Sequence, residues 1–243
     1  MLELIIVGVS VGLISGFFGI GGGTILIPLL LLLGYDIKVA IGISIVQMVF
    51  SSVYGSYLNH KKGTLDVKMI SAIGIGGSFG ALLSGPISSY FSDDVLEIVF
   101  LLFATFALIR LFSTTTEHLG QKDVKPMTLF GIGIPIGALS MTIGVGGSIM
   151  LVPILVSFLY VPLRKAVSAG LFFVVFSSIS GLISHAYHGS IDYEHGLMIG
   201  VASLLGVYFG TELKEKIDTT LQRKLLVMFY FTIVLYLAQR IFL

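Results

Sequence analysis

The sequence carries one glycine-rich stretch twice. Gly19-Ile20-Gly21-Gly22-Gly23, followed by Ile27-Pro28, matches Gly144-Val145-Gly146-Gly147-Ser148, followed by Val152-Pro153, at a spacing of 125 residues. After one inserted residue, Phe50-Ser51-Ser52 matches Phe176-Ser177-Ser178, and Gly63-Thr64-Leu65-Asp66 matches Gly189-Ser190-Ile191-Asp192. Agreement at so many positions predicts an internal duplication. We predict a first repeat over 1–116, a cytoplasmic linker over 117–126 and a second repeat over 127–243.

The composition indicates an integral membrane protein. Hydrophobic residues make up 56% of the chain, charged residues only 11%, and the mean hydropathy is +1.03. A soluble domain carries roughly 25% charged residues, so we expect most of this surface to face a lipid bilayer. A net charge of +1 leaves no electrostatic footprint for nucleic acid. Cysteine is absent, which excludes disulfides, cysteine-ligated zinc and thiol catalysis.

Ten apolar blocks, five in each copy, run over helical lengths without the alternation of strands. They predict an all-α membrane bundle, and the first block lacks the basic leader of a signal peptide. The blocks of the first copy are Leu2–Gly19, Thr24–Leu33, Ala40–Leu58, Val67–Tyr90 and Val95–Phe112, and those of the second are Met127–Ile143, Ile149–Tyr160, Ala166–Tyr187, Gly196–Leu213 and Leu221–Phe242.

Loop charges predict that the two copies have opposite orientations. In the first copy the loop after the third block is basic and the loop after the fourth is acidic, whereas the second copy shows the reverse. Lys and Arg accumulate on the cytoplasmic side, so equivalent loops lie on opposite sides and the repeats have inverted topology. The basic residues are Lys61, Lys62 and Lys68 in the first copy and Lys214, Lys216, Arg223 and Lys224 in the second.

The first two blocks of each copy are short and are joined by the glycine run. In the second copy, Lys122 and Lys125 precede these blocks and Arg164 and Lys165 follow them, which favours a chain that leaves the cytoplasmic side and returns to it. We therefore predict a glycine-tipped re-entrant hairpin in each repeat, although two full but short crossings satisfy the same parity. Glycine-broken helices at matching positions of inverted halves indicate a transport site.

The chemistry predicted for this site is anion binding. A half-helix that begins after the glycines presents free N–H groups and a partial positive charge at the tip, and no Lys or Arg lies in the middle of an apolar block. The alternative is that the glycines serve close helix packing and the polar residues ordinary inter-helix bonding. The candidate binding residues are Gly19, Gly21, Gly22, Gly23 and Thr24 at the first tip, Gly144, Gly146, Gly147 and Ser148 at the second, and Gln47, Ser51 and Ser177 on the third blocks.

Three further expectations concern Gln47, His185 and two aspartates. Gln47 corresponds to Phe173 in the second copy, which predicts a donor on one side of the site and an apolar wall on the other. His185 is a candidate for proton coupling because imidazole titrates near neutral pH, and bonding at the membrane interface is the alternative. Asp66 and Asp192 are expected to cap the helices that follow them.

We expect no enzyme activity, cofactor or metal, because no nucleophile with a base, paired carboxylates or metal-ligand spacing occurs within the blocks. The glycine motifs, with the Phe-Ser-Ser and Gly-Thr/Ser-x-Asp segments, resemble the sulfite exporter TauE/SafE family, also grouped as sulfonate uptake permeases. The resemblance covers essentially the whole chain. It implies a multi-pass protein of the inner (plasma) membrane and secondary transport of sulfite, a sulfonate or a related organosulfur anion. A passive anion or small-solute channel with two re-entrant loops is the alternative, and a homodimer is compatible with such a bundle.

Overall fold

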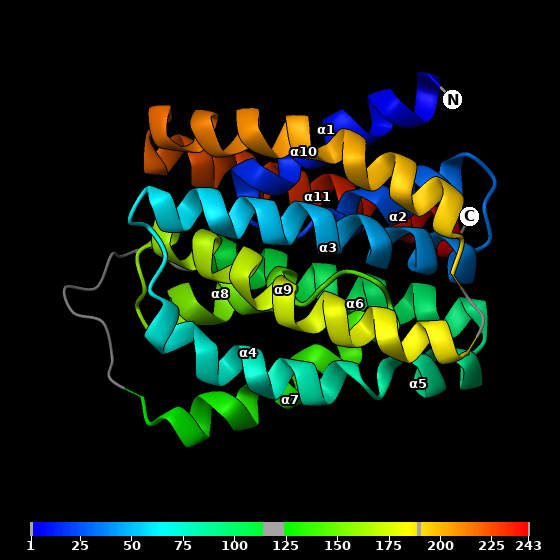
Figure 1. Ribbon diagram of the computed structural model, residues 1–243, viewed down its shortest axis with the longest axis horizontal. Coiled ribbons are helices and arrows are strands. Elements are labelled where there is room, and N and C mark those ends of the chain that lie inside the picture. The colour runs from blue at the N-terminus through cyan, green and yellow to red at the C-terminus, as the bar shows by residue number, and fades with distance from the viewer. Residues whose placement is uncertain (1, 114–123, 189–190, 243) are drawn as a thin grey trace.

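The computed structural model describes residues 2–113, 124–188 and 191–242, and every regular element in those ranges is a helix (Figure 1). The predicted linker over 117–126 lies mostly outside the described residues. In chain order the helices are α1 (Leu2–Phe18), α2 (Gly23–Leu32), α3 (Ile37–Lys61), α4 (Val67–Ala81), α5 (Ser84–Tyr90), α6 (Asp93–Ser113), α7 (Pro126–Thr142), α8 (Ser148–Phe158), α9 (Leu163–Tyr187), α10 (Tyr193–Lys216) and α11 (Thr219–Phe242).

The long helices fit the thickness of a membrane. Helices α3, α9, α10 and α11 are each long and apolar enough to cross a bilayer, and the pair α4 and α5, which is bent by 42°, makes a fifth span if it crosses as one unit. The remaining apolar helices α1, α2, α7 and α8 are shorter, as expected for the two glycine-linked pairs. The chain is therefore a multi-pass helical membrane protein.

The block 67–90, expected as one helix, is interrupted between Ala81 and Ser84. A side chain of α9 replaces helical hydrogen bonds at this point. The Gly85 N–H donates to Ser184 Oγ at 2.9 Å, and Ser184 Oγ donates to the Leu82 carbonyl at 2.6 Å. Pro86 lacks the N–H that would bond to the Leu82 carbonyl and its ring crowds that carbonyl, so it breaks the helix, and Ser184 Oγ takes up the freed carbonyl. The matching helix α10 continues unbroken to Lys216.

Each half packs its first helix on the fourth helix of the other half. Helix α1 lies along α10, and α7 lies along α4. A Cβ atom on Gly12 would overlap the Ser203 carbonyl of α10, and one on Gly137 would overlap the Gly77 carbonyl of α4. Small residues that let two backbones approach this closely are typical of membrane helix pairs. The two halves are therefore interlocked, with α3 and α9 packed against each other between them (Figure 1).

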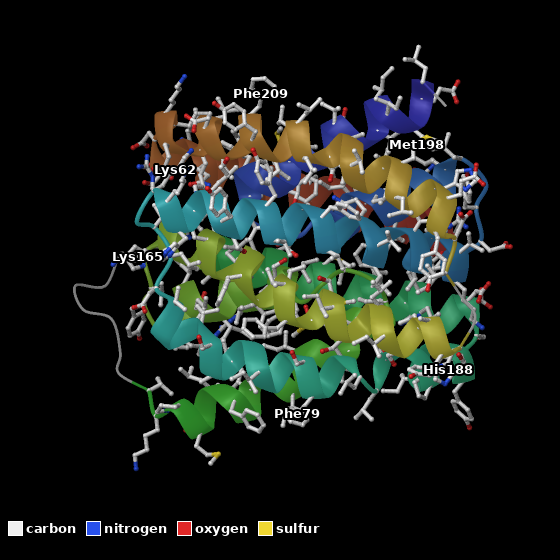
Figure 2. The ribbon with its side chains drawn as sticks, viewed as in Figure 1. Lys62, Phe79, Lys165, His188, Met198 and Phe209 are labelled. Carbon is white, nitrogen blue, oxygen red and sulfur yellow. The ribbon has the colours of Figure 1, made fainter. Side chains whose placement is uncertain are left out.

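Corresponding helices run in opposite directions along the bundle. In Figure 1 α3 runs from right to left and α9 from left to right, and α10 and α4 form a second opposed pair. Lys62 and Lys165 lie at one end of the bundle and His188 lies at the other (Figure 2). We call these the basic end and the histidine end. At the histidine end Asp192 Oδ1 accepts from the His195 N–H at 3.1 Å, which confirms the expected cap of α10, whereas the cap by Asp66 stays a prediction.

Candidate functional site

The two glycine motifs form loops of the same backbone shape. Three glycines in each loop have positive φ, a region that residues with a Cβ atom rarely adopt. The matched pairs are Gly19 (71°) with Gly144 (69°), Gly21 (74°) with Gly146 (78°), and Gly22 (84°) with Gly147 (87°). Gly22 is the N-cap of α2 and Gly147 is the N-cap of α8, so each loop ends at a helix N-terminus.

The two loop tips meet between α3 and α9. A Cβ atom on Gly23 would overlap the Gly144 carbonyl of the other loop. That carbonyl also accepts from Ser44 Oγ of α3 at 2.8 Å. Positions for a Cβ atom on Gly21 and Gly146 lie 3.0 and 3.1 Å from methyl carbons of Val174 on α9. The structure therefore brings together two motifs that are 125 residues apart in the sequence.

One polar and one aromatic side chain cover the two tips. The Gln47 amide lies against Gly22 so closely that a Cβ atom there would overlap it, and the Phe173 ring lies against Gly147 in the same way. Both side chains are fully buried. Gln47 and Phe173 therefore take matching positions at the two tips, an amide at one and an aromatic ring at the other, as the alignment of the two copies predicts.

Several polar atoms at the tips have no hydrogen-bond partner. They are Nε2 and Oε1 of Gln47, Oγ1 of Thr24 and Oγ of Ser148, and all three residues are 0% exposed. Buried polar groups are nearly always bonded, and each group left unbonded costs about 1–3 kcal/mol. Gln47 Oε1 can only accept, but Gln47 Nε2 and the two hydroxyls can donate. Unbonded donors beside two helix N-termini are suited to hold the oxygens of a small anion.

The hydroxyls of the two predicted serines, Ser51 and Ser177, face backbone carbonyls of the glycine loops. Ser177 Oγ donates to the Gly146 carbonyl at 2.9 Å, and Ser51 Oγ lies 3.4 Å from the Gly21 carbonyl. In this conformation the two hydroxyls fix the loop backbone. Gly19 has a packing role, because a Cβ atom there would overlap the Val167 carbonyl of α9.

His185 lies apart from the tips. It follows Phe173 by twelve residues on α9, which corresponds to about 18 Å along the helix. Its side chain is 1% exposed, its Nε2 atom has no partner, and its ring bonds to the backbone of Met141 at the end of α7. Sequence reasoning did not identify Ser140, whose Oγ lies 2.8 Å from a Cβ position on Gly147. Nothing in the sequence distinguishes this serine from the others.

A bundle of membrane-spanning helices around a buried polar site places the chain among multi-pass membrane proteins. Residues 4–237 match the family model "Sulfite exporter TauE/SafE", so the chain belongs to the TauE/SafE sulfite exporter family. It is 28% identical to the "Probable membrane transporter protein YdhB" of Bacillus subtilis, with 86% of this chain and 88% of that protein covered.

Two further relatives have similar names and coverage. The "Probable membrane transporter protein YunE" of Bacillus subtilis is 26% identical over 93% of this chain and 91% of that protein. The "Probable membrane transporter protein MJ0441" of Methanocaldococcus jannaschii is 27% identical over 91% of this chain and 87% of that protein. No solved structure gives a significant match. The family and these names mark the chain as similar to membrane transporters and specify no cargo beyond the family's own title.

Proposed function

We propose that this protein is a secondary transporter that binds a small organosulfur oxyanion, such as sulfite or a sulfonate, between its two glycine tips. The observation that carries the proposal is the fully buried, unpartnered amide of Gln47 against the tip at Gly22. The hydroxyls of Thr24 and Ser148 supply further unbonded donors at the two tips. Each helix N-terminus adds roughly half of a positive charge, so the site attracts an anion without a basic side chain.

The proposed transport cycle depends on inverted repeats. The opposite directions of α3 and α9 support this topology, as does the start of α1 at the histidine end and of α7 at the basic end (Figure 1). On this proposal the two glycine-linked helix pairs are re-entrant hairpins that enter from opposite sides. The lysines and arginines at the basic end favour a cytoplasmic location for it and an inner (plasma) membrane for the protein. Alternate opening of the two ends would then expose one central site to either side.

The closed surroundings of the site favour a carrier over an open channel. Every residue of the two glycine loops is buried, as are Gln47 and Phe173, which cover the tips. A bound anion would have no aqueous path to either end in this conformation. A carrier needs such an occluded state in each cycle, whereas a conducting channel needs a continuous pathway.

Counterflow in proteoliposomes tests the proposal. Vesicles containing the full chain are loaded with unlabelled sulfite, and the uptake of labelled sulfite is measured over a range of concentrations, with protein-free vesicles as the control. A carrier gives saturable uptake that internal sulfite accelerates. Uptake that rises linearly and ignores internal sulfite would establish the channel instead. The absence of protein-dependent flux for sulfite, methanesulfonate and thiosulfate would refute anion transport.

His185 is the residue that we propose for proton coupling. Its buried ring faces the end of α7 and has one nitrogen without a partner, so it can take up a proton when this part of the bundle opens. The change His185→Gln keeps a polar side chain and removes the titrating group. It should abolish uptake driven by a pH gradient and leave sulfite counterflow intact. Uptake that still follows the pH gradient in the variant would exclude His185 from coupling.

A further inference from the structure

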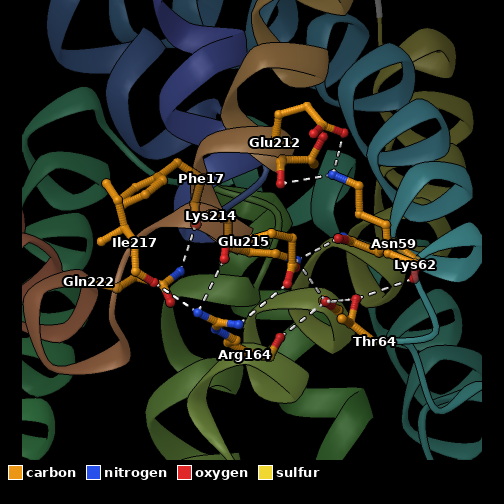
Figure 3. Close-up of polar contacts among 12 residues, drawn as sticks. Phe17, Asn59, Lys62, Thr64, Arg164, Glu212, Lys214, Glu215, Ile217 and Gln222 are labelled. Atoms are coloured by element: carbon orange, nitrogen blue, oxygen red, sulfur yellow. Dashed lines mark hydrogen bonds and ion pairs between the residues drawn. The ribbon is translucent and has the colours of Figure 1, made fainter.

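A second polar cluster lies at the basic end, away from the glycine tips. It joins the C-terminal end of α3, the N-terminal end of α9 and the C-terminal end of α10 (Figure 3). We call it the Lys214 cluster. Its charged members are Lys62, Arg164, Glu212, Lys214 and Glu215, and its uncharged members are Asn59, Thr64 and Ser168.

Lys214 is the centre of this cluster and is fully buried. Its Nζ atom donates to Asn59 Oδ1 at 2.5 Å and to Ser168 Oγ at 3.0 Å. Lysines that only set membrane topology extend their ammonium groups toward water and lipid headgroups. Lys216, two residues further along, and Lys165 on α9 are exposed in that way. The inward position of Lys214 therefore calls for another explanation.

The cluster carries more positive than negative charge. Glu212 pairs with Lys62 at 2.7 Å. Glu215 is shared between Arg164 at 3.5 Å and Lys214 at 3.6 Å. Three cations therefore share two carboxylates, which leaves one positive charge in excess around a buried ammonium group. A buried charge without full compensation is strongly unfavourable, and an anion would supply the missing charge.

Unused hydrogen-bond donors accompany this excess charge. Asn59 is 0% exposed and its Nδ2 atom has no partner, because its Oδ1 atom is turned toward Lys214. Arg164 Nε is also buried without a partner, while the terminal nitrogens of the same guanidinium bond to the Ile217 carbonyl at 2.8 Å and lie beside Glu215. Both atoms are N–H donors that cannot accept, so these two vacancies suit the oxygens of an anion. A third unbonded atom of the cluster, Glu215 Oε1, is an acceptor and lies 3.6 Å from the Lys214 ammonium.

The position of the cluster relates it to the tips. Asn59 follows Gln47 by twelve residues on α3, which is about 18 Å along the helix. Ser168 precedes Phe173 on α9. The helices that carry the tip-covering residues thus also carry the cluster, which lies between the tips and the aqueous phase at the basic end.

We propose that the Lys214 cluster is a second oxyanion site, which holds the anion between the glycine tips and the basic end of the bundle. Lys214 supplies the charge, and Asn59 Nδ2 and Arg164 Nε supply the directed donors. The inference rests on the proposed anion cargo and adds a residue set that the tip site does not contain. It predicts that the purified protein binds two equivalents of sulfite.

The change Asn59→Asp provides a sharp test. The new carboxylate has the shape of the amide, lies next to the Lys214 ammonium and cancels the excess charge. We expect calorimetric titration of the purified full-length protein with sodium sulfite, at constant ionic strength, to show two equivalents for the wild type and one for this variant. Its melting temperature should not fall. Lys216→Gln, which removes an exposed lysine from the same helix, is the matched control and should retain two equivalents.

A single equivalent for the wild type, or two for Asn59→Asp, would overturn the inference. If Asn59→Asp fails to fold, Lys214→Met removes the excess charge in another way and should also leave one equivalent. The proposal of transport and the proposal of a second anion site can be refuted independently of each other. Loss of one equivalent in Asn59→Asp without any flux in proteoliposomes would retain the cluster and refute the transporter. Saturable counterflow with two equivalents bound by the variant would retain the transporter and refute the cluster.

Discussion

Replacing Gln47 by methionine should stabilise the empty protein and weaken sulfite binding. Methionine has nearly the same length as glutamine and adapts to irregular spaces, so the packing against Gly22 is kept. The change removes an amide whose two polar atoms are buried without partners. Each such group costs about 1–3 kcal/mol, so the free energy of unfolding should rise. Hydrogen bonds to a charged ligand contribute about 1.5–3 kcal/mol, and their loss corresponds to roughly a 10- to 100-fold higher Kd.

Two measurements on one preparation test this reasoning. Melting of the detergent-solubilised protein without ligand reports the change in stability, and titration with sulfite reports the Kd. Ser56→Ala is the matched control, because Ser56 lies on the same helix and is also buried with an unpartnered hydroxyl. The control should leave the Kd unchanged. A lower melting temperature together with an unchanged Kd in Gln47→Met would show that the amide has a structural role only.

Three further predictions concern backbone and capping. Gly22→Ala should destabilise the protein in thermal melting more than Gly34→Ala does, because both residues have similar positive φ (84° and 86°) but only Gly22 also lies against a side chain. Gly12→Ala should disrupt the packing of α1 on α10 and lower the melting temperature, whereas Gly131→Ala, with open space around it, should not; equal effects would remove the packing argument. Asp192→Ala should cost about 1 kcal/mol by loss of the cap. Burial raises the pKa of Asp192, but hydrogen bonds from the side chain and the backbone N–H of His195 outweigh this effect and leave the pKa below its usual value. The capping contribution should therefore be present at neutral pH and disappear as the pH falls through the lowered pKa, and a melting difference that persists in strong acid would contradict it.

The sequence predicted the parts of the site that depend on local pattern. Repetition of the glycine motif at one spacing indicated two equivalent loops, and the structure gives Gly22 and Gly147 nearly equal φ values of 84° and 87°. The same register paired Gln47 with Phe173 before their positions were known. The prediction succeeds because duplicated segments with the same glycines adopt the same backbone conformation. Residues that align in sequence therefore occupy equivalent positions in the two loops.

Features that depend on contacts between distant helices were not predictable. The break before Ser84 follows from Pro86, which has no N–H to bond to the Leu82 carbonyl, but nothing within 67–90 indicates that Ser184 of α9 takes the place of that bond. The contact between Lys214 and Asn59 joins positions 155 residues apart. Charge patterning classified Lys214 correctly as a residue of the basic end, but only the packing of three helix ends could show that its ammonium group points inward.

The two proposed sites hold an anion by different means, and the difference follows from where each lies. A lysine at the centre of the bundle would carry its full charge in every step of a cycle, including steps in which no anion is present, and a buried unpaired charge is strongly unfavourable. Helix N-termini and the Gln47 amide avoid this cost, since the partial charges of a dipole need no counter-ion when the site is empty. Near the basic end an excess charge costs less than at the centre of the bundle, because Glu212 and Glu215 offset part of it and water is within a few residues. On this reasoning the Lys214 cluster concentrates anions at the entrance and the uncharged tips select among them. High salt should therefore weaken the sulfite bound at the Lys214 cluster far more than the sulfite bound at the glycine tips. Screening acts on net charge near water and little on a buried array of dipoles. Equal salt dependence of both equivalents would show that the two sites do not differ in this way.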